Sequence, residues 1–274
     1  MVFADELEPR LVNFRKKAKH PMPVPGDLVT VSVLDEDHAV VESVLPRTFA
    51  LERRTLGGQT KMMAANVDTL AIVAALIDPP IHLAMVDRLT AFAVQHDLAS
   101  TLLLTKADLT GMPAAEAVAQ IYGPLGIRVL ILQPKTGDGI EELRALIAAR
   151  HVMLIGQSGV GKSSIFRALG GVSVVGDVSR FGQGKQTTTS ARLFRLGGGF
   201  LIDSPGIGEF TLDPMPAIDV ASLFVEMRDL KSECRFRDCR HLQEPGCAIR
   251  GAVDAGAIAL SRYASYREIV GAPP

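Results

Sequence analysis

The sequence lacks a marked charge imbalance, because its 274 residues carry 29 lysines and arginines against 30 acids. This balance gives no global electrostatic argument for nucleic-acid binding, so any such argument must be local. Long apolar runs are also missing: the run at residues 71–77 is far short of the roughly 20 residues of a membrane helix. Residues 1–10 contain acids and no apolar core of the kind that a secretory signal has. We therefore expect a soluble, cytoplasmic, monomeric protein without membrane contact.

Cysteine is scarce, and its three copies all fall within residues 234–247. An odd number in a cytosolic chain argues against a disulfide framework. The spacing Cys234-x₄-Cys239-x-His241-x₅-Cys247 supplies three thiolates and one imidazole, a complete tetrahedral set for structural zinc. We expect one structural Zn²⁺ that folds a small module and takes no part in catalysis. The alternative is a group of unconnected free cysteines.

The cluster lies in a C-terminal region, residues 216–274, with helical patterns at 218–231 and 252–270 on either side of it. Basic residues crowd the same loop and favour contact with RNA phosphates, although two acids dilute the positive charge. The basic residues are Lys231, Arg235, Arg237 and Arg240, and the acids are Glu233 and Asp238.

The N-terminal region, residues 1–64, contains alternating β-branched segments at 28–33 and 39–44 around a turn-like acidic stretch. This pattern predicts a small β-domain. Between Arg10 and Gly26 the chain carries no acid and four basic residues, Arg15, Lys16, Lys17 and Lys19. That stretch is either a solvated arm or an arm that contacts phosphates.

The middle region, residues 65–215, alternates strand and helix patterns. A continuous apolar run at 67–77 is typical of a buried parallel strand. The βαβ rhythm predicts a parallel sheet that helices cover on both faces, followed by a hairpin. The expected strands are 99–104, 127–132, 151–155, 192–196 and 200–202, and the expected helices are 81–96, 114–122, 139–149 and 163–169.

A glycine-rich loop follows the apolar segment 151–155 and precedes a helical pattern. It fits G-x-x-x-x-G-K-[ST], in which glycines let successive N–H groups point at phosphate oxygens. In this pattern Lys162 reaches the β- and γ-phosphates, and the hydroxyl of Ser163 ligates Mg²⁺. A chance glycine-rich turn is the alternative. The expected nucleotide-binding residues of the loop are Gly156, Gln157, Ser158, Gly159, Val160, Gly161, Lys162, Ser163 and Ser164.

Two further positions complete the expected phosphate site. Asp203 ends an apolar strand and is placed to hold the magnesium water shell, while the N–H of Gly206 is placed to touch the γ-phosphate. Alone, Asp-x-x-Gly also describes many turns. The phosphate loop upstream makes the functional interpretation the stronger one.

The segment Thr105-Lys106-Ala107-Asp108 predicts the base. A carboxylate at Asp108 accepts two hydrogen bonds from guanine, and adenine has no matching donor pair. Lys106 would lie along the base, and Thr105 begins the element. This element precedes the phosphate loop, whereas it follows the loop in most GTPases, so the order predicts a circular permutation of the same sheet.

Together these residues resemble one family, the circularly permuted GTPases that depend on the small ribosomal subunit (RsgA-type). The resemblance spans nearly the whole chain. It rests on the loop, the guanine element and the cysteine cluster, and on several further segments. These are Gly26-Asp27-Leu28-Val29, Leu45-Pro46-Arg47, Ala64-Ala65-Asn66-Val67-Asp68, residues 176–179, Thr187-Thr188-Thr189 and Asp203-Ser204-Pro205-Gly206.

The resemblance implies a circularly permuted α/β P-loop GTPase domain at 65–215. It also implies an N-terminal OB-like small β-barrel at 1–64 and a C-terminal α-helical zinc-binding module at 216–274. The implied activity is hydrolysis of GTP to GDP on the maturing small (30S) ribosomal subunit, with Mg²⁺ bound beside the nucleotide. The implied partners are that subunit and its rRNA, which the first and last domains would contact.

Three departures from the family bear on the site. One is Gln133-Pro134-Lys135, which stands where the family has a Ser-Ala-Lys element on the purine side. Thr105 stands where the family has Asn, and Gln186 stands where it has His just before three threonines. Because the apolar Ile207 cannot orient the attacking water, we hypothesise that Gln186 does so. We expect one of the threonines at 187–189 to reach Mg²⁺ and the γ-phosphate, and we assign this role to Thr188.

Two other functions remain open at this point. The first is an RNA-binding assembly module that uses guanine nucleotide as a ligand switch, with incidental hydrolysis. The basic stretch between residues 10 and 26 and the cysteine loop favour that interpretation. An ATP-using P-loop enzyme is the second, and Asp108 argues against it.

Overall fold

A computed structural model of the chain describes residues 13–16, 22–35, 38–54, 60–170, 192–203 and 212–271. The chain divides into two compact units, Met1–Ala71 with Gln133–Glu209, and Ile72–Leu132 with Phe210–Pro274. The division falls inside one strand of the central sheet.

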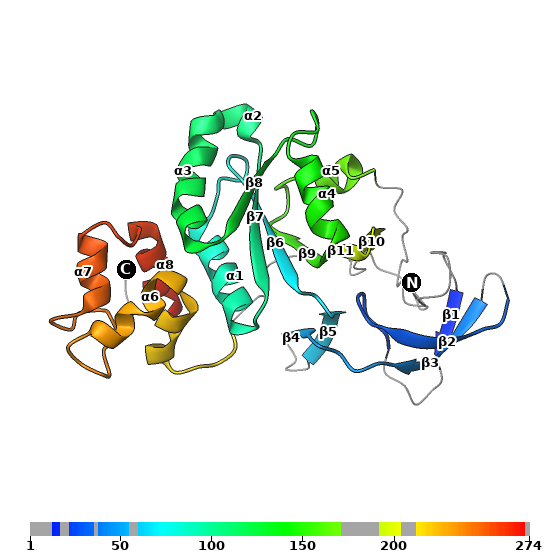
Figure 1. Cartoon of the computed structure of the whole chain (residues 1–274), viewed down its shortest axis with the longest axis horizontal. Coiled ribbons are helices and arrows are strands. Elements are labelled where there is room, and N and C mark those ends of the chain that lie inside the picture. The colour runs from blue at the N-terminus through cyan, green and yellow to red at the C-terminus, as the bar shows by residue number, and fades with distance from the viewer. Residues whose placement is uncertain are drawn as a thin grey trace. The chain divides into compact units, whose positions relative to one another are not determined.

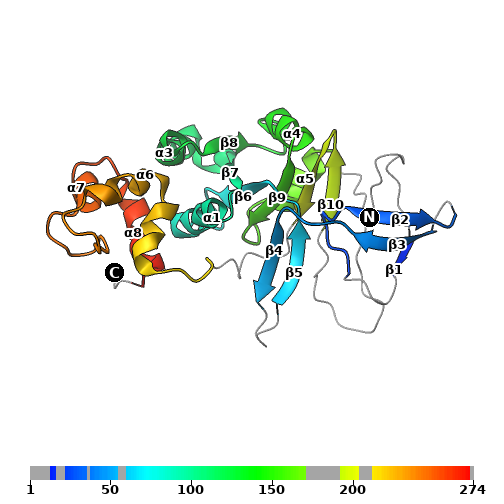
Figure 2. The ribbon, with the colours of Figure 1, turned by 60° about the horizontal axis from the view of Figure 1, so that its bottom comes forward.

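The first unit begins with short strands. β1 (Asn13–Lys16), β2 (Val29–Val33) and β3 (His38–Val44) form a three-stranded sheet, with β3 in the middle (Figure 2). β1 runs parallel and β2 antiparallel to β3. β4 (Ala50–Arg54) and β5 (Thr60–Ala65) pair as an antiparallel hairpin. The two predicted β-branched segments are therefore confirmed as neighbouring antiparallel strands.

Polar contacts around Asn66 fasten these strands to one another. The side-chain amide of Asn66 donates to the carbonyl of Gly26 at 2.9 Å, and its oxygen accepts from the N–H of Thr48 at 2.9 Å. Gly26 has φ +91°, and a Cβ there would lie 1.9 Å from the carbonyl oxygen of Ala65. Only glycine fits so close to a neighbouring backbone. The segments around residues 26, 48 and 66 thus meet at one point.

A six-stranded sheet has the order β10-β11-β9-β6-β7-β8. All seven residues of β6 (Thr69–Ala75) are buried, as the continuous apolar run predicts. β11 runs parallel to β9, β8 runs parallel to β7, and β10 closes an antiparallel hairpin with β11. The other strands are β7 (Ala99–Thr105), β8 (Arg128–Leu132), β9 (His151–Gly156), β10 (Arg192–Leu196) and β11 (Gly199–Asp203).

Helices connect the strands where the sequence predicts them. α1 (Leu83–Gln95) precedes β7, and α3 (Met112–Tyr122) precedes β8. The remaining connections are α2 (Ala107–Thr110), a 3₁₀ turn η1 (Gly123–Leu125), α4 (Ile140–Ala148) and α5 (Lys162–Ala168). In the described ranges, the helices are all too short or too polar to cross a membrane.

The C-terminal part of the second unit packs on α1 through α8 (Leu260–Ile269) (Figure 1). The helical pattern at 218–231 does not form one continuous helix. That stretch forms η2 (Ala217–Leu223), α6 (Val225–Arg228) and η3 (Leu230–Glu233). The break comes at Phe224, whose backbone is extended at φ −98°, ψ 109° while its side chain is fully buried. Burial of this ring overrides the local helical pattern.

The helical pattern at 252–270 corresponds to two helices, α7 (Ala248–Asp254) and α8. Gly256 adopts φ +74°, which ends α7 with a left-handed residue. The N–H of Ala257 then donates to the carbonyl of Ala252 at 2.9 Å, as in a Schellman motif. Gly256 therefore ends α7, although the apolar periodicity of the sequence continues past it.

Candidate nucleotide-binding site and metal centre

The glycine-rich loop leaves the end of β9 and enters α5, as predicted. β9 is held at its start, where the carboxylate of Asp68 accepts from the N–H of His151 at 3.0 Å. In the loop, Gly159 has φ +82° and Gly161 has φ +102°, conformations that residues with a Cβ rarely adopt. The side chain of Val160 is 2% exposed and fixes the loop to the core. The backbone is thereby preorganised.

Lys162 is the first residue of α5, and its ammonium folds back over the loop. Nζ donates to the carbonyl oxygen of Gly156 and, at 2.8 Å, to that of Gln157. Burial lowers the pKa of Lys162, and the negative charge of Asp203 acts in the opposite direction. A half-buried cation on a glycine-rich loop at the start of a helix is a site for a polyanion such as a triphosphate.

Asp203 ends β11, next to β9, with Leu154 as its register partner. It is partly buried and lies close enough to Lys162 to act on its charge. The hydroxyl of Ser163 is exposed in the first turn of α5. A hydroxyl and a carboxylate are the hard oxygen donors that Mg²⁺ prefers, so this donor set fits that ion. When bound, the ion would neutralise charge that develops on phosphate oxygens.

The guanine element belongs to the second unit and sits at the end of β7. Lys106 has left-handed backbone geometry at φ 62°, and its Nζ donates to the carbonyl oxygen of Asp78. Asp108 is exposed in the first turn of α2. A carboxylate on a fixed turn at the carboxyl end of a strand is placed to accept hydrogen bonds from a ligand. Sequence reasoning missed the contact with Asp78, for which no motif gives a signal.

Thr105 lies differently from the two charged residues of this element. Its side chain is 2% exposed, and its hydroxyl donates to the carbonyl oxygen of Ala74 at 3.4 Å. The backbone carbonyl of Thr105 accepts from the N–H of Leu76 at 3.1 Å. The threonine therefore fastens the end of β7 to neighbouring backbone. The remaining predicted residues, Gln186, Thr188 and Gly206, lie outside the described residues.

The cysteine cluster is confirmed as a compact group. One ligand atom from each of its four residues lies within 4.8 Å of the others. The sulfurs of Cys234 and Cys247 are 3.9 Å apart, and Nδ1 of His241 lies 3.4 Å and 3.5 Å from them. A tetrahedral zinc site with Zn–S of about 2.3 Å and Zn–N of about 2.1 Å implies separations of about 3.8 Å and about 3.6 Å. The residues therefore fit Zn²⁺.

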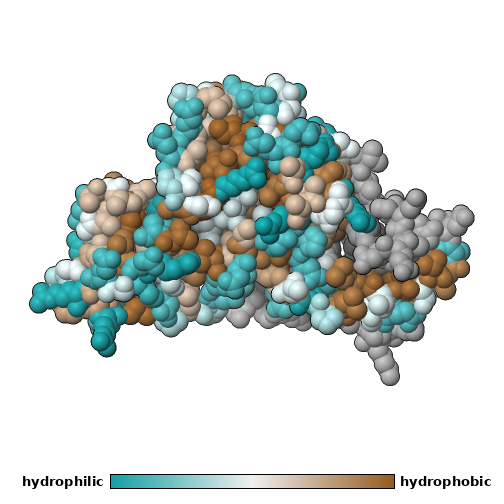
Figure 3. Space-filling model, in the orientation of Figure 1, coloured by the Kyte–Doolittle hydropathy of each residue, from teal (hydrophilic) through white to brown (hydrophobic). Residues whose placement is uncertain are grey.

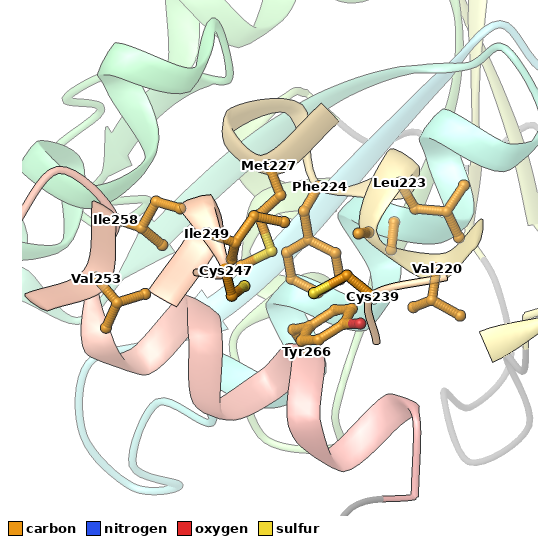
Figure 4. Packing of buried hydrophobic residues seen from close by; sticks show 12 residues of the cluster. Val220, Leu223, Phe224, Met227, Cys239, Cys247, Ile249, Val253, Ile258 and Tyr266 are labelled. Carbon is orange, nitrogen blue, oxygen red and sulfur yellow. The ribbon is translucent and has the colours of Figure 1, made fainter. Parts of the chain in front are cut away.

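Burial explains how the cluster is built into the C-terminal core. Cys239 and Cys247 pack among apolar side chains that include Phe224 and Tyr266 (Figure 4). Burial raises the pKa of both thiols, so a bound cation is what stabilises them as thiolates. The hydroxyl of Tyr263 donates to the carbonyl of His241 at 2.6 Å and holds that loop in place.

Glu244 organises the loop between the last two ligands. Its carboxylate accepts from the N–H groups of Arg240, Leu242 and Gln243 at 2.9–3.0 Å. Burial opposes its ionisation, but these hydrogen bonds outweigh burial and lower the pKa of Glu244 to about 2. Hydrophilic side chains project from this part of the molecule (Figure 3). The cluster thus holds a rigid loop with a polar outer surface.

The sheet order and the two sites define a class of protein. The strand that carries the phosphate loop is central, yet β6, β7 and β8, with the guanine element, come before it in the chain. A P-loop sheet of this kind is a circularly permuted GTPase, and here it is joined to a module whose Cys₃His cluster fits a metal ion.

Comparisons with known proteins give the family. The family model described as RsgA GTPase matches residues 44–213. The protein named small ribosomal subunit biogenesis GTPase RsgA from Pseudomonas fluorescens is 43% identical over 94% of this chain and 77% of its own length. Its namesake from Azotobacter vinelandii is 42% identical over 98% of this chain and 80% of its own. The chain belongs to the RsgA GTPase family and is a GTP-hydrolysing enzyme.

Solved structures agree with that assignment. YjeQ from Thermotoga maritima superposes with a TM-score of 0.74 at 27% identity, over 94% of this chain and 88% of that one. YloQ, described as a circularly permuted GTPase, gives a TM-score of 0.70 over 96% of this chain and 86% of that one. At 23% identity, the second comparison supports the fold alone.

Proposed function

We propose that this chain hydrolyses GTP as a late maturation factor of the small ribosomal subunit, and that the subunit stimulates the hydrolysis. The observation that carries the proposal is the preorganised loop on β9 with Lys162 and Asp203 beside it. The curated relatives named above support the ribosomal role. The protein would act in the cytoplasm as a monomer, within three domains at 1–64, 65–215 and 216–274.

The roles of the site residues follow from chemistry. Residues 156–164 would hold the phosphates, with Ser163, Asp203 and Thr188 around Mg²⁺ and the N–H of Gly206 at the γ-phosphate. Lys106 and Asp108 would select guanine, with Thr105 as a backbone anchor. Gln186 would orient the attacking water. One Zn²⁺ would be held by the Cys₃His cluster.

The decisive measurement is GTP turnover with and without purified small ribosomal subunits. We expect slow turnover alone and faster turnover with subunits, because the apolar Ile207 cannot orient the attacking water and the bound subunit must complete the water site. Lys162→Ala should reduce stimulated turnover by roughly 100-fold or more, since a preorganised charge at the phosphates is lost. Equal turnover with and without subunits would contradict the proposal.

Gln186→Ala tests how water is oriented. We expect unchanged GTP affinity and a fall of roughly 10- to 100-fold in stimulated turnover. The control is Gln120→Ala, which removes an exposed glutamine from α3. Equal stimulated turnover in the two variants would show that Gln186 has no such role.

A second candidate is an RNA-binding module that uses nucleotide as a ligand switch. The basic loop beside the metal ligands favours it. The ligand-switch hypothesis predicts that the Gln186→Ala variant loaded with GTP still dissociates from the subunit. If that variant instead stays bound, the result favours the enzyme hypothesis, in which hydrolysis is needed for release. Competition for bound, labelled GTP distinguishes both of these functions from an ATP-using enzyme. We expect GDP to compete and ATP not to compete, because Asp108 should reject adenine.

A further inference from the structure

One large aromatic side chain of the C-terminal module is not used in its core. Phe236 is 41% exposed and lies two residues after the metal ligand Cys234. The buried apolar cluster of the module is built from other residues, among them Phe224 and Tyr266. The exposed ring is available for contact with a partner.

The backbone that presents Phe236 is held from both sides. The N–H of Arg235 donates to the carbonyl of Gly246 at 3.0 Å, and the N–H of Cys239 donates to the carbonyl of Phe236 at 3.3 Å. Gly246 has φ +72°, and a Cβ there would come within 3.0 Å of the Arg235 side chain. The absence of that Cβ lets the arginine stem lie against the loop. The ring is therefore presented by a preorganised turn.

The surroundings of the ring are positive. The guanidinium carbon of Arg235 lies 5.4 Å from the centroid of the Phe236 ring, within reach of a cation–π contact. Residues 231–240 contain four cations and two acids, a local charge of +2 in a chain of net charge −1. Arg235, Arg237 and Arg240 are all exposed. A protein partner would favour an extended apolar patch, whereas a single ring among arginines matches a nucleic acid.

We propose that Phe236 is a stacking platform for an unpaired RNA base, and that the neighbouring arginines bind the adjoining phosphates. The inference deepens the proposed function, because it rests on contact between this module and ribosomal RNA. Bases stack on aromatic side chains through their π-faces, which tolerates any sequence but requires an unpaired nucleotide. The module therefore recognises single-stranded RNA.

The absence of tryptophan from the chain allows a direct test. Phe236→Trp places a single fluorescent indole at the platform of the zinc-loaded, full-length protein. A short unstructured single-stranded RNA should quench its fluorescence, and a duplex of equal length should quench it much less. The control is Leu260→Trp, at a 75% exposed position at the start of α8 in the same module. Equal quenching at both positions, or equal quenching by both RNAs, overturns the proposal.

Affinity measurements separate stacking from charge. Phe236→Leu should weaken single-strand binding by about 5- to 100-fold and leave the salt dependence unchanged, whereas Phe236→Tyr should bind like the parent. Arg237→Ala should lower the slope of log K against log salt by about 1. Zinc content and thermal midpoint confirm that each variant is folded. Unchanged RNA affinity in Phe236→Leu overturns the proposal.

The same variants distinguish failure of this inference from failure of the proposed function. If subunits do not stimulate the parent protein, the proposed function fails, whatever Phe236 does. If subunits stimulate the parent and Phe236→Leu equally, with equal RNA affinity, the stacking inference alone fails. If Phe236→Leu loses stimulation but keeps its RNA affinity, the ring contacts a ribosomal protein, which also overturns stacking.

Discussion

At the scale of single residues, Arg262 is the centre of a buried polar network in the second unit. Its guanidinium donates to Asp87 at 2.8 Å and to both carboxylate oxygens of Glu226 at 2.7 Å and 3.0 Å. Arg262 is 2% exposed and lies over the ring of Phe224. Burial opposes its charge, but the two carboxylates outweigh burial and raise the pKa of Arg262. Tyr122 completes the network by donating to Asp87 at 2.7 Å.

Arg262→Met should lower the free energy of unfolding by about 3–5 kcal/mol, because it leaves two buried carboxylates without their cation. Denaturant unfolding of the zinc-loaded protein measures the change. Arg88→Ala is a matched control, since Arg88 also joins α1 to α8, through Glu268 at 2.7 Å. That pair is exposed, so its loss should change stability by at most about 1 kcal/mol. Similar losses in the two variants would contradict this account.

At the scale of elements, strands were easier to predict than C-terminal helices. β6 and β9 can be recognised in the sequence as apolar runs, because both faces of a parallel strand are buried. The phosphate loop and the cysteine cluster are also local patterns, so their residues could be named in advance. The helix breaks at Phe224 and Gly256 could not be predicted from the sequence. The burial of the Phe224 ring and a short Schellman motif at Gly256 interrupt the helices although the helical periodicity continues. The contacts of Lys106 and Thr105 depend on neighbouring segments and leave no local pattern.

Two glycines should respond in opposite ways to alanine. A Cβ at Gly199, the first residue of β11, would lie 1.9 Å from the carbonyl oxygen of Ile147. Gly199→Ala should therefore lower the free energy of unfolding by at least about 1–3 kcal/mol. Gly251, within α7, has no neighbour within 4 Å of such a Cβ. Gly251→Ala should raise stability by about 0.5–1 kcal/mol. The thermal midpoints of the two variants test both expectations. If both midpoints shift in the same direction, the packing described for these glycines is contradicted.

At the scale of the whole molecule, we expect a metal ion at the Cys₃His cluster to stabilise the C-terminal core. Cys239 and Cys247 belong to the same buried cluster as Ala91 of α1. Removal of zinc by a chelator should therefore unfold α7 and loosen α8, with a fall in helical circular dichroism and in the thermal midpoint. Added Zn²⁺ should restore both, and added Mg²⁺ should not. A spectrum that survives complete loss of zinc would show that the apolar core suffices.

The network around Arg262 also sets an order of events during synthesis. The partners Asp87 and Arg262 are separated by 175 residues of chain. At about 5–20 residues per second, a ribosome needs about 9–35 s to add that length. Throughout this interval the carboxylate of α1 has no guanidinium to meet it. The buried ion pairs of Arg262 with Asp87 and Glu226 can therefore form only after the ribosome has synthesised the last helix, α8.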